Sequence, residues 1–149
     1  MRAVIQRVLG ASVETGGEEV ASIGRGLLVF AGLGAEDTAG DMEYVARKVI
    51  GARIFDDDAG VMNLSVSDVG GEVLLVSQFT LYGDMRRGMR PSYSPAMRPD
   101  DARPAFENFV GLFRSLHGNT KAGVFGADMK VSLVNDGPVT ILIDSARLF

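Results

Sequence analysis

The uninterrupted apolar segment Gly26–Leu33 limits most strongly what this chain can fold into. A run of this length without a polar side chain is typical of a strand that is buried within a sheet. A second stretch, Glu72–Phe79, is almost as apolar, follows two glycines and predicts another strong strand. Ala3–Val8 alternates more loosely and predicts a third. The chain is therefore expected to fold around a sheet.

Further strands are predicted on both sides of turn-forming residues near the end of the sequence. Met129–Val134 and Val139–Ile143 are expected to be two strands, joined by a turn at Asn135–Pro138. The apolar pair Val124–Phe125 predicts a short strand before them. With the strands Ser12–Glu14 and Glu19–Ile23, which flank a plausible hairpin turn at Gly16-Gly17, the whole sequence contains about seven or eight strands.

Two segments carry the apolar spacing of amphipathic helices. The first covers Met42–Ile50, with Asp37 or Asp41 as its N-cap and Gly51 as its end. The second runs from about Asp101 to Leu116. Together with the strands, these helices predict the α+β class: a single domain over residues 1–149, with a curved, barrel-like, mostly antiparallel β-sheet and two main helices.

Composition excludes several classes of function. The chain has no cysteine, which excludes disulfides, thiolate metal sites and a cysteine nucleophile. Its net charge is −4 and its pI is about 4.9, the opposite of a broad duplex-binding surface, so we expect no DNA partner. Arg2 and Arg7 interrupt any signal-peptide core, and no apolar run is long enough for a membrane span. We therefore expect a cytoplasmic protein without a membrane partner.

One segment is basic although the net charge of the whole chain is negative. Met85–Arg98 holds four arginines and no acid. Charge alone fits a solvated loop as well as a contact with RNA phosphates. The length of the loop favours a functional role, because long loops in compact domains are often functional.

The residues of the common catalytic sets are mostly missing. His117 is the only histidine, and its place at the end of a predicted helix gives it a structural explanation. We therefore expect neither a Ser-His-Asp triad nor a zinc site. Two polar segments remain, Ser77–Thr80 at the end of an apolar strand and Asn135–Thr140. From the residues alone, the first also fits a strand that runs into a loop, and the second an ordinary turn.

Three longer motifs contain or accompany these segments: Val76–Leu81, Arg87–Ser92 and Val131–Thr140. On these motifs, and along its whole length, the chain closely resembles the D-aminoacyl-tRNA deacylase family of bacteria and eukaryotes. The main departures are Tyr82–Met85 and a short C-terminal extension, Ser145–Phe149. Neither lies in a motif.

The resemblance implies an enzyme that hydrolyses the ester bond of D-aminoacyl-tRNA. It implies a homodimer in which the Gly137-Pro138 bond is cis and reaches into the partner's site, with Arg7 holding the motif in place. The carbonyl oxygens of this pair would collide with an L side chain and tolerate a D side chain, so L-aminoacyl-tRNA is rejected. Glycine has no side chain, and hydrolysis of glycyl-tRNA is therefore expected as well.

The resemblance also implies a reaction without a side-chain base, a cofactor or a metal. The backbone N–H groups of Phe79 and Thr80, beside Gln78, would stabilise the oxyanion. A hydroxyl of the substrate's own ribose would assist the reaction. The alternative inside the family is Thr80 as a nucleophile, for which the sequence offers no activating base.

The implied partner, besides a second copy of the chain, is the acceptor end of aminoacyl-tRNA. The residues implied to surround the terminal adenosine and amino acid are Ser77, Ala102, Phe125 and Met129. The residues expected to contact tRNA phosphates are Arg86, Arg87 and Arg90. Two other interpretations stay open: a dimeric RNA-binding module without catalysis, and a general Ser/Thr esterase.

Overall fold

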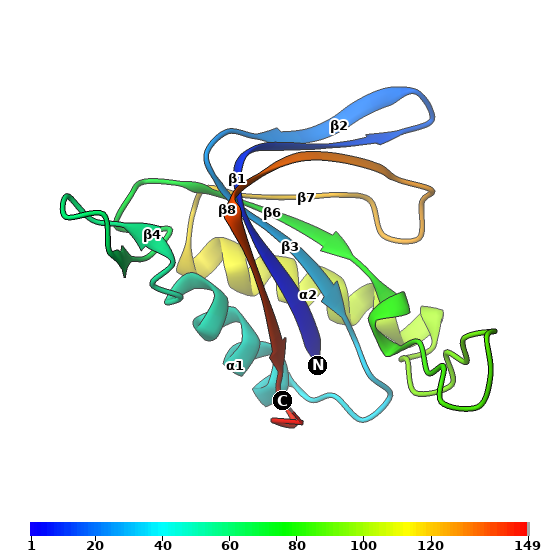
Figure 1. Cartoon of the computed structure of the whole chain (residues 1–149). Helices are drawn as coiled ribbons and strands as arrows, with labels where there is room; N and C mark the ends of the chain where they lie inside the picture. The colour runs from blue at the N-terminus through cyan, green and yellow to red at the C-terminus, as the bar shows by residue number, and fades with distance from the viewer. Residues whose placement is uncertain (149) are drawn as a thin grey trace.

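Strand β1 (Arg2–Thr15) is the axis of the sheet in the computed structural model, which describes residues 1–148 (Figure 1). One edge of β1 is divided between two strands: the first half pairs with β3 (Gly26–Gly32) and the second half with β2 (Glu18–Ile23). The other edge pairs with β8 (Lys130–Asp144) along nearly its whole length. All three pairings are antiparallel.

The sheet continues from β3 through two parallel pairings, first to β6 (Glu72–Ser77) and then to β7 (Thr120–Ala122). The curl of the sheet brings β7 toward β2, where Lys121 Nζ donates to the carbonyl oxygen of Ser22 at 2.6 Å. A separate hairpin is formed by β4 (Phe55–Asp56) and β5 (Met62–Leu64). The predicted α+β class with a curved, mostly antiparallel, barrel-like sheet is confirmed.

Helices α1 (Ala39–Ile50) and α2 (Pro99–Leu116) lie on the same face of the sheet (Figure 1). Leu27 and Val29 of β3 belong to the large core cluster on this face, together with Phe109 of α2. Leu28 belongs to a second cluster that contains residues of β1, β2, β3 and β6. Strand β3 is therefore buried on both faces, which explains its unbroken apolar sequence.

The N-terminus of α1 is capped by Thr38, not by Asp37 or Asp41 as predicted. Thr38 Oγ1 accepts from the Asp41 N–H, and Asp41 Oδ2 accepts from the Thr38 N–H at 2.8 Å, which is a capping box. The hydrogen bond from the Thr38 hydroxyl is the largest cause that lowers the pKa of Asp41 to about 2. Asp37 instead accepts from the Gly34 N–H. Gly51 ends α1, as predicted.

Two predictions about the strands are wrong. Val124–Phe125 is not a strand but lies in the loop between β7 and β8, where the Phe125 ring packs at 5.8 Å from that of Phe106. The predicted turn at Asn135–Pro138 lies inside the continuous strand β8. Gln6 pairs with Thr140 and Val8 pairs with Asn135, so Asp136–Val139 form a bulge opposite the single residue Arg7.

Of the helices in residues 1–148, none is long and apolar enough to cross a membrane.

Helix α2 starts at Pro99, two residues before the predicted start. Proline fits this position because it has no N–H group, and the N–H groups in the first turn of a helix lack an acceptor within the helix.

We predict that Gly26→Ala destabilises the protein while Gly24→Ala, in the same turn, does not. A Cβ at Gly26 would lie 1.9 Å from the carbonyl oxygen of Glu72, so β3 and β6 would have to separate. A Cβ at Gly24 has no neighbour nearer than 3.6 Å. Urea unfolding should show a loss of about 2–3 kcal/mol for Gly26→Ala and less than about 0.5 kcal/mol for Gly24→Ala. Equal losses would contradict this account of the pairing.

Candidate active site

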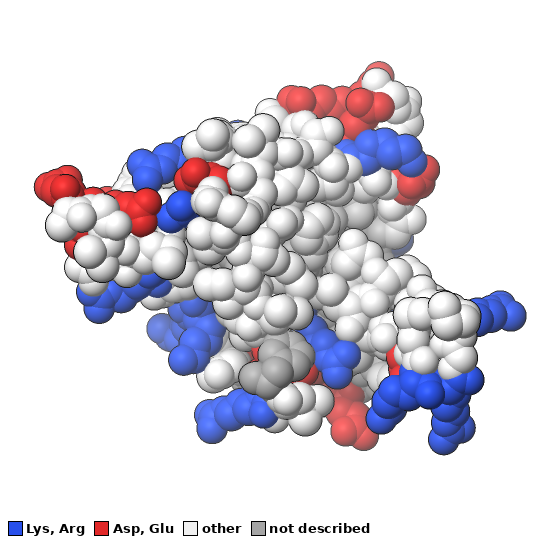
Figure 2. Space-filling model, in the orientation of Figure 1, with Lys and Arg blue, Asp and Glu red and all other residues white. Residues whose placement is uncertain are grey.

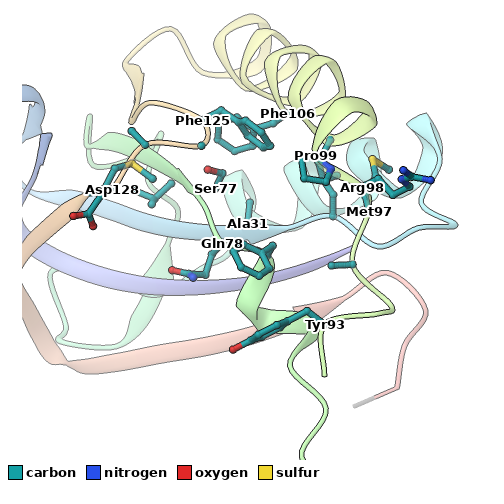
Figure 3. Close-up of a pocket in the computed structure, with 18 of the residues that line it drawn as sticks. Ala31, Ser77, Gln78, Tyr93, Met97, Arg98, Pro99, Phe106, Phe125 and Asp128 are labelled. Carbon is teal, nitrogen blue, oxygen red and sulfur yellow. The ribbon is translucent and has the colours of Figure 1, made fainter. Parts of the chain in front are cut away.

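A cavity of about 660 Å³ opens between the end of β6, the start of α2 and the loop that leads into β8 (Figure 3). Its lining is mostly apolar, as ligand pockets usually are. The residues that the sequence placed at the site and that line this cavity are Ser77, Gln78, Phe79, Ala102, Phe125 and Met129. Most of the predicted site is therefore gathered in one place.

The segment Gln78–Thr80 is held where β6 ends beside β3. The Gln78 N–H donates to the carbonyl oxygen of Ala31 at 2.8 Å, which continues the pairing of the two strands by one residue. The chain then turns into the short 3-10 helix η1 (Phe79–Tyr82). A Cβ at Gly32 would lie 2.8 Å from the Gln78 carbonyl oxygen, so this close approach requires glycine.

The first N–H groups of η1 are available as donors. The opening N–H groups of any helix lack a partner inside that helix, and within residues 1–148 neither the Phe79 nor the Thr80 N–H donates a hydrogen bond. The side chain of Gln78 donates through Nε2 to Thr80 Oγ1. Thr80 is exposed and lies just outside the cavity lining, next to Phe79.

The apolar wall of the cavity comes from α2 and the loop before β8. Figure 3 shows Phe106 and Phe125 together on one side, above Ser77. The guanidinium carbon of Arg103 lies 5.1 Å from the centre of the Phe125 ring, a cation–π contact that fixes the ring from outside. Ala102 is buried, and its small side chain leaves the cavity open at the start of α2.

Sequence reasoning did not assign several of the lining residues to the site. Among them are Tyr93, Arg98, Phe106 and Asp128. Tyr93 and Arg98 belong to the long basic loop, whose length was the sequence signal for Tyr93 and whose length and charge were the signals for Arg98. The Tyr93 ring lies 5.1 Å from that of Phe79 in an edge-on arrangement at the rim of the cavity. Phe106 had been assigned only to the apolar face of its helix.

Arg7 is buried opposite the bulge of β8 and contacts it directly. Its Nε donates to the carbonyl oxygen of Asp136 at 3.3 Å and lies 3.1 Å from the Asp136 carboxylate. Its Nη1 donates to the carbonyl oxygen of Ile54 at 2.7 Å. The side chain of Asn135 spans the bulge, donating to the carbonyl oxygens of Arg7 and Val139.

The Gly137-Pro138 peptide bond in this bulge is cis, and both residues are exposed. Gly137 has a φ of 125°, which disfavours any side chain at this position. Among the described residues that line the cavity, Arg7, Gly137 and Pro138 are all absent. The structure of one chain therefore does not bring the two predicted parts of the site together.

The basic loop carries its arginines on the surface (Figure 2), and Arg86, Arg87 and Arg90 are all exposed. Arg86 forms two side-chain hydrogen bonds with Asp84, at 2.9 and 2.7 Å. These bonds are the main cause that lowers the pKa of Asp84 to about 2. Asp84 lies just before the acid-free segment, so the charge of Arg86 is partly offset.

His117 has a structural place at the end of α2. Its Nδ1 lies 3.2 Å from Ser67 Oγ and its Nε2 lies 2.9 Å from the carbonyl oxygen of Gly71. These contacts connect the helix to the loop that precedes β6. No group of three or more His, Asp or Glu side chains in residues 1–148 is arranged to hold a metal ion.

The family model described as D-Tyr-tRNA(Tyr) deacylase matches residues 4–144. The chain belongs to this family. Among its curated relatives, proteins named D-aminoacyl-tRNA deacylase from Thermotoga petrophila and Thermosipho africanus are 56% and 54% identical to it, each over the full length of both chains. Family membership makes the chain an enzyme, a hydrolase of the deacylase type.

Solved structures agree with this fold. One named c-Myc DNA Unwinding Element Binding Protein has a TM-score of 0.93 and 41% identity, covering 97% of this chain and 98% of its own. A probable eukaryotic D-amino acid tRNA deacylase has a TM-score of 0.81 at 16% identity, covering 95% of this chain and 97% of its own. The second likeness bears on the fold alone. Deacylase relatives therefore share this barrel-like sheet and its two helices.

Proposed function

We propose that this chain hydrolyses the ester bond of D-aminoacyl-tRNA, releasing the free amino acid and tRNA. The observation that carries the proposal is the pair of N–H donors at Phe79 and Thr80, at the rim of an apolar cavity in a chain of the deacylase family. Acyl transfer needs donors aimed at the developing oxyanion, and this pair provides them. A tRNA substrate also implies work in the cytoplasm.

The reaction proceeds without a side-chain base. Water attacks the ester carbonyl carbon, the ester C–O bond breaks, and the ribose oxygen leaves with a proton. The neighbouring ribose hydroxyl of the substrate assists the proton transfer, while the protein positions the carbonyl. Gln78 donates to the Thr80 hydroxyl and cannot act as its base. This geometry favours oxyanion stabilisation over Thr80 as a nucleophile.

The cavity accommodates the end of the acceptor strand. Phe125 and Met129 offer an apolar surface to the terminal adenosine, and Ala102 leaves room beside it. Ser77 lies at the floor, where β6 ends. A cavity of about 660 Å³ is of the size that takes a nucleoside with an attached amino acid.

Handedness is enforced by a second copy of the chain. The carbonyl oxygens of Gly137 and Pro138 face the α-carbon of the substrate and collide with an L side chain. Because these residues are exposed and outside the cavity of their own chain, a partner must supply them. Arg7 fixes the bulge that presents them. Glycine escapes this selection, so glycyl-tRNA is also hydrolysed.

The surface around the bulge supports a homodimer. Three large apolar side chains on β1 and β8 are more than half exposed: Leu9, Val134 and Leu142. They lie on the strands that present Gly137-Pro138, and exposed apolar groups of this kind are common at protein interfaces. A two-fold dimer would place one bulge at each of two equivalent sites.

The exposed arginines contact tRNA phosphates beyond the terminal nucleotide. Arg87 and Arg90 are exposed, and Arg86 lies beside them. Tyr93 and Arg98 of the same loop line the cavity, so the basic segment leads directly to it. An acidic protein that binds only the acceptor end of tRNA needs no basic surface larger than this local segment.

The purified protein is expected to release the amino acid from D-tyrosyl-tRNA and to leave L-tyrosyl-tRNA intact, with and without EDTA. Release of free tyrosine measures both rates. Equal hydrolysis of the two substrates would contradict chiral selection, and loss of activity in EDTA would contradict the metal-free mechanism. Absence of hydrolysis together with tRNA binding would favour the non-catalytic RNA-binding module.

Thr80→Ala is expected to retain activity within about tenfold of the unmodified protein, because the backbone N–H survives while the hydroxyl is lost. Thr80→Val serves as its size-matched control and should behave in the same way. Steady-state hydrolysis of D-tyrosyl-tRNA measures the effect. Complete loss in both variants, or an acyl group trapped on Thr80 of the unmodified protein, would establish the nucleophile mechanism instead.

Arg7→Lys is expected to lower the ratio of D- to L-tyrosyl-tRNA hydrolysis. A single ammonium cannot replace the fork that contacts Asp136 and Ile54 together, so the bulge loses its fixed shape. Arg53→Lys is the matched control, since Arg53 is exposed and bonds to Asn63. Both rates are measured with the dimer mass checked in solution. An unchanged ratio in a dimeric Arg7→Lys protein would show that the rejection of L-aminoacyl-tRNA does not depend on this bulge.

A further inference from the structure

A contact network behind the cavity connects the ends of β1 and β8 to the far end of η1. Arg2 Nη1 donates to the carbonyl oxygen of Leu81 at 3.0 Å, and Arg2 Nε donates to Asp144 Oδ2 at 3.0 Å. The Asp144 side chain is only 3% exposed. One guanidinium therefore bridges the last residue of β8 and the third residue of η1.

Tyr82, the last residue of η1, is held by the same network. The Arg2 guanidinium carbon lies 4.7 Å from the centre of the Tyr82 ring, and the Tyr82 hydroxyl donates to Asp37 Oδ2 at 3.3 Å. Burial, followed by the charge of Asp37, raises the pKa of Tyr82 well above its ordinary value, so the phenol stays protonated and keeps donating. A Cβ at Gly34 would lie 2.6 Å from this hydroxyl, so the ring packs directly on backbone.

These contacts matter because η1 is too short to hold its own shape. A helix of four residues has almost no stability in isolation. Its first end is fixed by the bond from the Gln78 N–H to Ala31. Its second end is fixed by Arg2 at Leu81 and by Asp37 at Tyr82. A tilt at the second end would move the N–H groups of Phe79 and Thr80.

We infer that Arg2 is a positioning residue for the oxyanion-binding turn. It is not among the residues lining the cavity, so it acts on the reaction through η1. The role of the N–H groups that it positions rests on the proposed function. A displacement of about 1 Å at reacting groups can cost about 100-fold in rate. Loss of the Arg2 contacts can therefore lower the rate substantially, although Arg2 lies away from the reacting groups.

Arg2→Met and Arg2→Lys test the inference. Methionine keeps an apolar stem over Tyr82 but loses both donors, and lysine cannot bridge Asp144 and Leu81 with one ammonium. Both should lower kcat on D-tyrosyl-tRNA by about 10–100-fold and leave KM within about twofold. The matched control is Arg47→Met, because Arg47 is an exposed arginine of α1 that pairs with Glu43. This control should keep full activity.

Amide NMR spectra give a readout that does not depend on activity. In Arg2→Met the backbone amide signals of Phe79 and Thr80 should shift, and the Leu81 and Gly83 amides, which donate to Gln78 and Thr80, should exchange faster with solvent. The amide signals of Arg47→Met should match those of the unmodified protein. Tyr82→Phe provides a second variant if Arg2→Met does not fold. It removes only the bond to Asp37 and should give the same shifts with a loss of kcat of about fivefold.

Two outcomes would overturn the inference. One is a lower melting temperature in Arg2→Met with unchanged kcat below that temperature. The other is unmoved amide signals at Phe79 and Thr80 in Arg2→Met and Tyr82→Phe. If the unmodified protein shows no hydrolysis, the proposed function fails, and the amide signals alone decide whether Arg2 positions the turn.

Discussion

The rest of the structure depends on the pairing of β1 with β8. This ladder runs nearly the full length of both strands, and its largest interruption lies where Asp136–Val139 face Arg7. One end of the ladder puts Arg2 against Asp144, from which it reaches η1. Its middle puts Arg7 against the bulge. A single strand thus supports both the turn that carries the N–H donors and the segment proposed to select handedness.

Much of the fold could be predicted because its elements have strong local patterns. The strand β3 lacks polar residues because it is covered on both faces, and α1 and α2 repeat apolar residues toward one core. The bulge could not be predicted in this way. Glycine and proline mark a turn and a bulge alike, and only the pairing with β1 decides between them. Thr38 was missed as a cap because three polar residues stand near the start of α1.

The candidate site depended on the resemblance for its assembly. Composition and spacing singled out Ser77–Thr80 but gave it no function, since a polar strand end is common. The structure puts Ser77 beside Phe125 and Ala102, which lie on other elements. Tyr93 and Asp128 reach the cavity through loops whose paths no local pattern specifies. The segment proposed to select handedness lies outside its own chain's cavity, so contacts within one chain do not join it to the site.

Because β3 is buried on both faces, its backbone hydrogen bonds should break far less readily than those of the exposed loops. Strand β3 has paired neighbours on both edges, β1 and β6, so its amide protons exchange only when the whole protein unfolds. The basic loop is held near its base by the bridge between Asp84 and Ser92, and most of it is exposed, so it opens at little cost. The part of the loop that lines the cavity is held more firmly, because Ala96 pairs with Gly34 and the Met97 N–H donates to the Leu33 carbonyl oxygen. The tip of the loop can therefore change its backbone conformation while the hydrogen-bonded floor of the cavity keeps its shape.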